Sequence, residues 1–147
     1  METIRQVLER KGAAVHSVSP DATVYDALAV MAEHDIGAVV VMESDRLVGI
    51  FSERDYARKV VLRGLVSRDV KVSQLMTPNP RTIGLDNTVE EVMNLMTENR
   101  FRHLPVVDGG RLIGIVTIGD MVKSVVSQHQ RTINQLSSYI AGNLAAE

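Results

Sequence analysis

The chain has 147 residues, a formal net charge of -2, and lysines and arginines that are scattered along it. A chain of this size buries roughly 70% of its unfolded surface, which is enough for one compact domain or two small interlocked repeats. Aromatic residues make up 3% of the sequence and cysteine is absent, so the core must be aliphatic, and disulfides and thiolate sites are excluded. This composition argues against a nucleic-acid partner and favours a cytoplasmic location.

The first residues of the chain place Ile4, Val7 and Leu8 at helical spacing among charged side chains. This pattern predicts a short amphipathic helix and lacks the apolar stretch of a signal peptide. The longest apolar runs, such as 38–42, are far shorter than the roughly 20 residues that cross a bilayer. We therefore expect no membrane partner.

The most informative feature is an internal repeat: residues 18–55 superpose on residues 83–120 at an offset of 65 without a gap. Two copies are fewer than the three or more repeats that a solenoid needs to bury its faces. The economical arrangement is a closed pair in which each repeat covers the other about a pseudo-twofold axis. Identical residues at this offset include Asp21 and Asp86, Met31 and Met96, Gly49 and Gly114, and Asp55 and Asp120.

Each unit is predicted to contain a strand, a helix, two strands and a second helix. Capping patterns at Thr23 and Thr88 start the first helix of each unit, and these helices should end near His34 and Asn99. Two β-rich runs follow in each copy, and the turn residues between them predict hairpins. In the first unit these strands are expected at 38–42 and 47–51.

The segments outside the repeat are also predictable. Prolines at 78 and 80 predict that 72–80 is extended and leads into the second unit. After Asp120 the apolar positions predict a long amphipathic helix that ends near Gly142, with a candidate break in its polar middle, 127–131.

These elements together predict an α+β fold of two β-α-β-β-α repeats packed about a pseudo-twofold axis. We assign residues 1–72 to the N-terminal helix and the first repeat. Residues 73–147 form the second repeat and the C-terminal helix.

Each repeat carries a hydroxyl residue three positions before an aspartate: Ser52 with Asp55, and Thr117 with Asp120. Free N–H groups at a helix N-terminus favour a phosphate, a hydroxyl can add a hydrogen bond, and two carboxylate oxygens suit a ribose diol. Such a motif is also a capping box, which is a purely structural feature. Its duplication in register favours ligand binding by at least one copy.

The repeat unit resembles a cystathionine β-synthase (CBS) domain, and the two together resemble the CBS pair called a Bateman module. The resemblance spans nearly the whole chain and rests on 49–55, 114–120, 102–107 and 75–77. It implies a non-catalytic regulatory module that binds an adenine nucleotide in a cleft between the repeats. AMP is the first candidate, followed by ADP, ATP and NAD, with S-adenosylmethionine as a further option.

The resemblance also implies roles for individual residues. Asp55 and Asp120 would bind ribose, and Ser52 and Thr117 would lie on the phosphate side. Backbone at 37–39, at 102–104 and in the turn around Thr82 would hold adenine. The complete candidate set is Gly37, Ala38, Val39, Ser52, Arg54, Asp55, Thr82, Arg102, His103, Leu104, Pro105, Thr117 and Asp120.

The two copies differ in ways that bear on ligand preference. Arg54 would favour a phosphate, and the second copy has Gly119 there, so the two sites can prefer different ligands. His103 either meets a phosphate or is an ordinary strand residue. The basic residues from 54 to 63 either form a solvated face or guide a polyphosphate. The other histidines lack metal-binding spacing, so we expect no metal site and no catalytic cofactor.

The resemblance further implies a homodimer, to which the long C-terminal helix can contribute, and an effector protein that reads the nucleotide state. Two other classes stay open. A dimerising scaffold with empty clefts would show no stabilisation by adenosyl ligands, and an enzyme would turn nucleotide over, although no activated nucleophile is recognisable. The sequence leaves open which ligand each site prefers, whether both are occupied, which partner is regulated and how the dimer is built.

Overall fold

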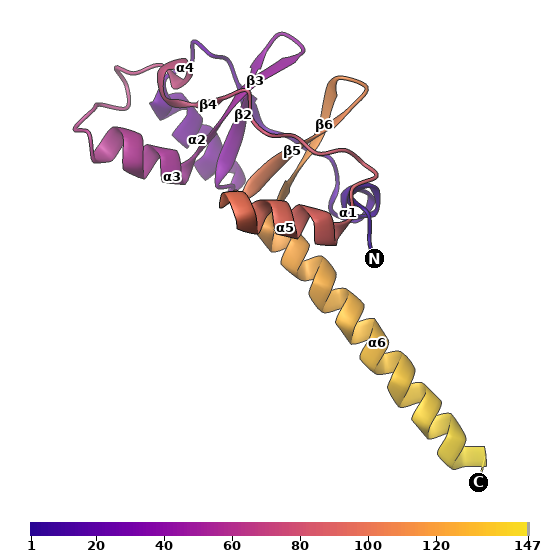
Figure 1. Cartoon of the computed structure of the whole chain (residues 1–147). Helices are drawn as coiled ribbons and strands as arrows, with labels where there is room; N and C mark the ends of the chain where they lie inside the picture. Colours follow the sequence, from indigo (N-terminus) through magenta and orange to yellow (C-terminus); the bar gives the residue numbers. More distant parts are fainter. Residues whose placement is uncertain (147) are drawn as a thin grey trace.

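The computed structural model describes residues 1–146, with side chains up to residue 142. Two hairpin-based units lie side by side, and a long C-terminal helix extends away from them (Figure 1). The elements are α1 (Ile4–Lys11), β1 (Ser17–Val18), α2 (Val24–His34), β2 (Ala38–Glu43), β3 (Arg46–Ser52), α3 (Glu53–Asp55), the π-helical segment η1 (Tyr56–Val61), α4 (Val72–Leu75), β4 (Thr77–Pro78), α5 (Val89–Asn99), β5 (His103–Asp108), β6 (Arg111–Thr117) and α6 (Ile118–Ala146).

The strand pairing repeats at the offset seen in the sequence. Within residues 1–146, one sheet has the order β1-β2-β3-β4 and the other pairs β5 with β6. Val41 lies opposite Gly49 in the first hairpin, and Val106 lies opposite Gly114 in the second. Both hairpins shift register directly after that valine. The equivalent strands β3 and β6 contact each other, so the predicted fold of two repeats is confirmed.

Local capping chemistry explains where the two equivalent helices begin and end. The Thr23 hydroxyl accepts a hydrogen bond from the Asp26 amide, and the Thr88 hydroxyl does the same at the start of α5. Such a bond satisfies one of the free N–H groups of the first turn. Asp35 and Arg100 adopt left-handed backbone conformations at the C-terminal ends. Both helices therefore have the bounds that the sequence predicts.

Each repeat has its own aliphatic core, but the short helix that precedes each repeat in the chain packs in the core of the other repeat. Ile4, Val7 and Leu8 of α1 are buried in the core of the second repeat. Val72 and Leu75 of α4 are buried in the core of the first repeat. The two cores therefore do not follow the division of the sequence at residue 72.

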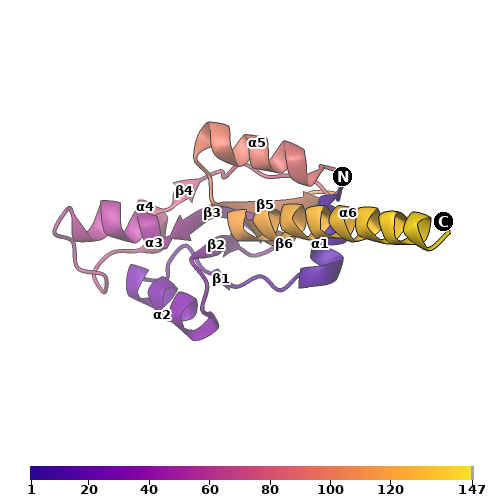
Figure 2. The same ribbon diagram turned by 90° about the horizontal axis from the view of Figure 1, so that it is seen from below.

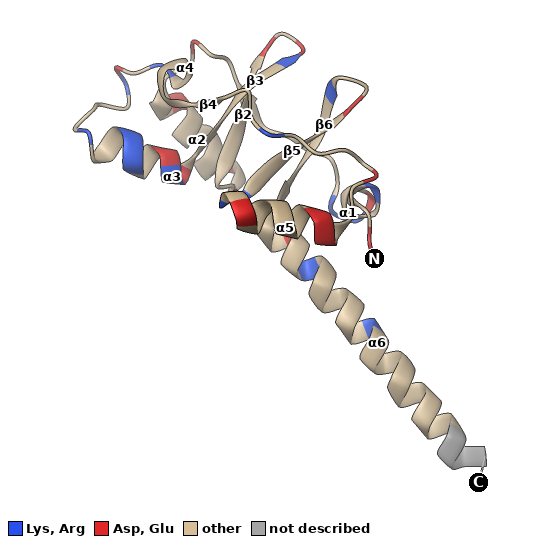
Figure 3. Ribbon diagram, in the orientation of Figure 1, with Lys and Arg blue, Asp and Glu red and all other residues tan. Residues whose placement is uncertain are grey.

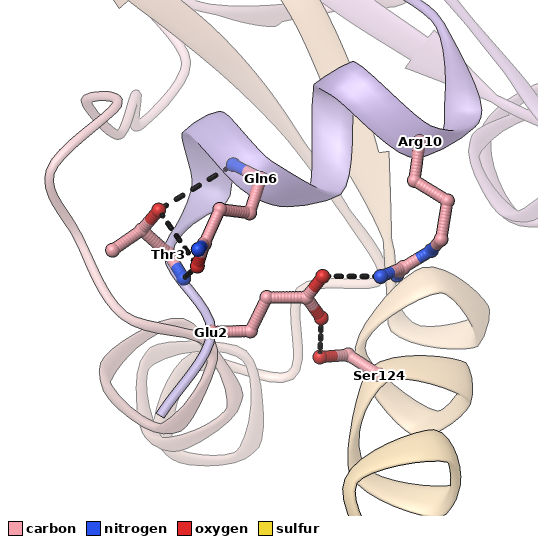
Figure 4. Close-up of polar contacts among 5 residues, drawn as sticks. All are labelled: Glu2, Thr3, Gln6, Arg10 and Ser124. Atoms are coloured by element: carbon pink, nitrogen blue, oxygen red, sulfur yellow. Dashed lines mark hydrogen bonds and ion pairs between the residues drawn. The ribbon is translucent and has the colours of Figure 1, made fainter.

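A polar cluster fastens α1 to α6 (Figure 4). The buried Ser124 hydroxyl donates to the Glu2 carboxylate, which also pairs with Arg10. Burial by itself raises the pKa of Glu2, but the bonds from Ser124 and Arg10 outweigh it and hold the pKa below its ordinary value. Thr3 and Gln6 form the capping box that starts α1.

Two segments differ from the sequence prediction. Val72–Leu75 is a helical turn, because the two apolar residues that bound it both face the first core, and strand pairing in this segment is confined to β4. The predicted break at 127–131 is absent from the described chain, and α6 is one helix to Ala146 (Figure 2). The segment has no glycine or proline, so nothing in it interrupts helical hydrogen bonding.

None of the described helices combines the length and apolar character that a bilayer crossing requires.

Candidate functional site

Two clefts lie between the repeats, and the 65-residue offset relates them. Cleft 1, of about 690 Å³, contains Ser52 and His103 in its wall. Cleft 2, of about 360 Å³, contains Thr117 and Ala38, which are the equivalents of those residues at the offset. Each cleft is thus bounded by the end of the second hairpin strand of one repeat and by the helix-to-strand turn of the other.

Cleft 1 gathers six of the thirteen predicted site residues. Ser52, Arg54 and Asp55 come from the first repeat, and the turn before β5 supplies its opposite wall. The lining residues are Ile50, Ser52, Arg54, Asp55, Arg58, Thr77, Asn79, Pro80, Arg81, Asn99, Arg100, Phe101, Arg102, His103 and Leu104.

Asp55 is held rigidly at the edge of cleft 1. Its Oδ2 accepts hydrogen bonds from the Ser52 amide and hydroxyl, both at 3.0 Å, and its own amide donates to Ser52 Oγ at 3.2 Å. Lys59 Nζ lies 3.3 Å from Oδ1. The side chain is 19% exposed, so the capping box presents one fixed carboxylate to the cleft.

The electrostatic character of cleft 1 is set by arginines. Of the residues that the structure describes, five arginines line it: Arg54, Arg58, Arg81, Arg100 and Arg102. None of the five pairs with a carboxylate within the described part of the chain. Guanidinium groups bind phosphate oxygens through paired donors, so this cleft suits a polyanion.

Cleft 2 contains a different set of polar groups. Lys11 is the only lysine or arginine among the described residues that line it. Lys11 Nζ donates to Asp120 Oδ2 at 2.6 Å and to the Ile115 carbonyl oxygen at 2.9 Å. Asp120 also accepts from the Thr117 amide at 2.8 Å, as in the capping box of the first repeat. The second predicted ribose carboxylate is thus already paired.

His103 forms part of the wall of both clefts. Gly37 lies against it: a Cβ added at Gly37 would be 3.4 Å from His103 Nε2. Burial lowers the pKa of His103, the charges of Lys11 and Arg102 lower it further, and Asp120 and Asp55 act in the opposite direction. The lowered pKa favours the neutral form of the His103 imidazole.

The remaining predicted residues lie in varied positions. Gly37 and Ala38 line cleft 2, whereas Val39 and Pro105 are buried in β2 and β5. Thr82 is exposed and lies outside the lining of both clefts, beside Arg81.

Among the polar cleft residues that sequence reasoning missed are Lys11, Asn79 and Arg100. Asn79 and Arg100 have positive φ angles, and they lie in the short connections that follow β4 and α5. Such connections are where binding groups commonly occur, which was the available signal. Nothing in the local sequence marks Lys11, because its role depends on where α1 packs.

Comparison with known proteins agrees with this architecture. The family model for the CBS domain matches residues 4–62 and 72–127. The chain is 40% identical to the CBS domain-containing protein CBSX3, mitochondrial, of Arabidopsis thaliana, over 95% of this chain and 72% of the relative.

Solved structures show the same likeness. A Burkholderia ambifaria protein described as a signal-transduction protein with CBS domains is 47% identical, with a TM-score of 0.83 over 85% of this chain and 94% of that one. The CBS-domain containing protein ATU1752 of Agrobacterium tumefaciens is 41% identical, with a TM-score of 0.80 over 83% of this chain and 98% of that one. The chain therefore belongs to the CBS-domain family and carries a tandem pair of CBS domains.

Proposed function

We propose that this protein is a regulatory module that binds an adenine nucleotide in cleft 1 and transmits the bound state to a partner protein. The observation that carries this proposal is the convergence of a fixed carboxylate, Asp55, and five arginines on one cleft. A carboxylate that accepts from a ribose diol and a cationic wall that binds phosphates are the two polar requirements of a nucleotide. Apolar Ile50, Phe101 and Leu104 supply a surface for the base.

The arginines also indicate the ligand class. Each additional phosphate on the nucleotide can meet a further guanidinium, so ATP and ADP should bind more tightly than AMP. NAD, with two phosphates, is the next candidate. S-adenosylmethionine is disfavoured because its sulfonium is cationic and would approach the same arginines.

Regulation would follow from the position of the cleft. A bound nucleotide would contact Asp55 of the first repeat and Arg102 of the second, so it would stabilise the arrangement that brings these residues together. A ligand shifts a conformational equilibrium only by its difference in affinity for the two states. A partner that recognises this arrangement would then bind in a nucleotide-dependent manner, without catalysis by the module and in a reducing compartment such as the cytoplasm.

We further propose that the module is a homodimer joined through α6. Every residue from 129 to 142 is exposed, so the described part of the chain leaves the side chains of this part of α6 uncovered. An isolated helix of this length is marginal in water. Figure 3 shows that the helix also carries few charges along this part. A second copy of α6 would cover the exposed side chains.

The proposed function is tested by calorimetric titration and thermal unfolding with ATP, ADP and AMP. A nucleotide present at about one hundred times its Kd should raise the free energy of unfolding by about 2.7 kcal/mol. Asp55→Ala should remove this ligand-induced gain. The matched control is Asp86→Ala, whose carboxylate is 96% exposed and pairs only with Arg5 within the described chain. That variant should respond to nucleotide like the wild type.

Asp55→Ala also removes one partner of the capping box, so the comparison must use the ligand-induced change of each variant. If none of the three nucleotides stabilises the wild-type protein, the nucleotide proposal is wrong and the dimerising scaffold is the better description. Release of phosphate by the pure protein would instead indicate an enzyme.

A further inference from the structure

The two clefts are not equivalent, because α1 is longer than its counterpart α4. Leu8 packs under Gly114 as Met76 packs under Gly49, so these two residues occupy equivalent positions in the two repeats. After that position the chain at Met76 leaves the helix and enters β4, whereas α1 continues to Lys11. The additional turn brings a lysine to cleft 2 that has no equivalent in cleft 1.

Lys11 occupies the hydrogen-bonding positions that a ligand would need. Its ammonium bonds both Asp120 Oδ2, at 2.6 Å, and the Ile115 carbonyl oxygen, at 2.9 Å. The side chains of Lys11 and Asp120 are 29% and 18% exposed, so the pair is partly shielded from water. A charge-assisted bond of this kind is roughly twice as strong as one from a neutral hydroxyl. A ribose diol would therefore have to replace a strong bond with a weaker one.

Cleft 1 has no such obstruction. Asp55 lines cleft 1, whereas Lys11 forms the corresponding part of the wall of cleft 2. Asp55 is also paired with a lysine, Lys59, but this pair is longer, at 3.3 Å, and Lys59 lies outside the cleft lining. The two clefts thus contain the same capping box, but only in cleft 1 does its carboxylate face the open space.

The volumes and charges agree with this difference. Cleft 2 has about half the volume of cleft 1, 360 Å³ against 690 Å³. Once Lys11 is paired with Asp120, the described lining of cleft 2 presents Asp35 and two histidines, His16 and His103, in place of arginines. This lining offers little to a phosphate, so an opened cleft 2 would accept an uncharged nucleoside more readily than a nucleotide.

We infer that Lys11 is a built-in occupant of cleft 2, which closes that cleft to adenosyl ligands and leaves one nucleotide site per chain. The inference rests on the proposed function, because it concerns the second copy of the same site. It also gives α1 a role in specificity besides its role in packing. Removal of the ammonium should free Asp120 and open a second site.

The test is calorimetric titration of the full chain with adenosine, which carries no phosphate. Lys11→Met keeps a long unbranched side chain and good helix propensity but removes the charge. This variant should bind one more adenosine per chain than the wild type, and adding Asp120→Ala should abolish that gain. Lys71→Met is the matched control, because Lys71 pairs with Asp21 on the surface and lies outside both clefts. It should keep the wild-type stoichiometry.

The outcomes separate the inference from the proposed function. If the wild type already binds two adenosines per chain, or if Lys11→Met gains none while ATP still binds the wild type, Lys11 does not close cleft 2. If ATP fails to bind the wild type at all, the proposed function itself is wrong. Because Lys11 also bonds the Ile115 carbonyl, thermal unfolding of Lys11→Met should first show that the variant is folded.

Discussion

At the scale of single residues, His103 is the group that both clefts share. It lies against Gly37. Burial lowers its pKa, the charges of Lys11 and Arg102 lower the pKa further, and the charges of Asp120 and Asp55 raise it. The residue at the equivalent position of the first repeat is Ala38. The second repeat therefore has an imidazole at the position where the first repeat has the methyl group of Ala38.

The lowered pKa of His103 predicts a pH dependence of stability. A histidine in the unfolded chain binds a proton with a pKa near 6.5, and folding lowers that pKa. The unfolded state therefore binds more protons, so the free energy of unfolding falls as pH decreases from about 6.5 toward the folded-state pKa. Above about 6.5 this contribution is fully present.

Denaturant unfolding between about pH 7.5 and about pH 5, a range that spans the unfolded-state pKa of about 6.5, measures this effect. His103→Ala and His103→Gln remove the titrating group, and both variants should lose less stability on acidification than the wild type does. The two substitutions differ in how well they fill the space beside Gly37, so their absolute stabilities can differ. Equal acid sensitivity of wild type and both variants would show that His103 does not titrate in this way.

At the scale of elements, the exchanged helices depend on two glycines that let α1 and α4 approach a strand closely. A Cβ at Gly114 would lie 2.9 Å from Leu8 Cδ2. A Cβ at Gly49 would overlap the Met76 side chain and lie 3.1 Å from the backbone oxygen of Thr77. The first obstruction is the flexible end of a side chain, whereas the second includes backbone in a paired strand.

This difference predicts unequal effects of the same substitution. Gly49→Ala should destabilise the protein by about 1–3 kcal/mol, because β4 must move to make room. Gly114→Ala should cost less, because Leu8 can change rotamer. Chemical denaturation of the two variants gives the comparison directly. If Gly114→Ala were the more damaging, the close approach of α1 to β6 would be the more rigid contact.

At the scale of the whole molecule, α6 presents an apolar stripe with the spacing of a two-stranded coiled coil. From Val122 onward the stripe residues alternate by four and three positions, and those described are at least 48% exposed where they are large and apolar. β-branched residues at the a positions with leucine at a d position favour parallel dimers. The a positions are Val126, Ile133 and Ile140, and the d positions are Val122, His129 and Leu136.

The flanking positions agree with pairing between identical helices. The residues that would border the seam beyond His129 are Gln130, Thr132, Ser137 and Tyr139, none of which carries a charge at neutral pH. Two copies can therefore approach without repulsion between like charges. Arg131 lies at an outer position of the same heptad pattern.

This arrangement predicts a dimer of twice 16.2 kDa in sedimentation equilibrium. Ile133→Glu places charges in the seam and should shift the protein to a monomer, whereas Ser138→Glu adds the same charge at an outer position and should leave the dimer intact. Because the chain has no cysteine, Leu136→Cys gives a single thiol whose oxidation should link two chains only if the helices are parallel. A wild-type monomer would contradict the pairing, and a dimer that resists this cross-link would contradict its parallel orientation.

Much of the fold could be predicted from the sequence because its signals are local. Thr23 and Thr88 mark helix starts, turn residues mark the hairpins, and the offset of the two aspartates marks one capping box in each repeat. Prediction failed at 72–80, where two prolines suggested extended backbone throughout, but burial of Val72 and Leu75 in the first core favours a helical turn. It also failed at 127–131, where polarity suggested a break but no residue interrupts the helix.

The sequence by itself determined the repeat, the elements of each unit and the two capping aspartates, because capping, turn formation and periodicity act between residues a few positions apart. Only the tertiary structure decided which repeat α1 covers, that arginines from three separate segments meet in cleft 1, and that Lys11 reaches an aspartate 109 residues away. An apolar helix face can pack against either of two similar cores, and its spacing does not specify which. The difference between an open cleft and a closed one follows from that choice.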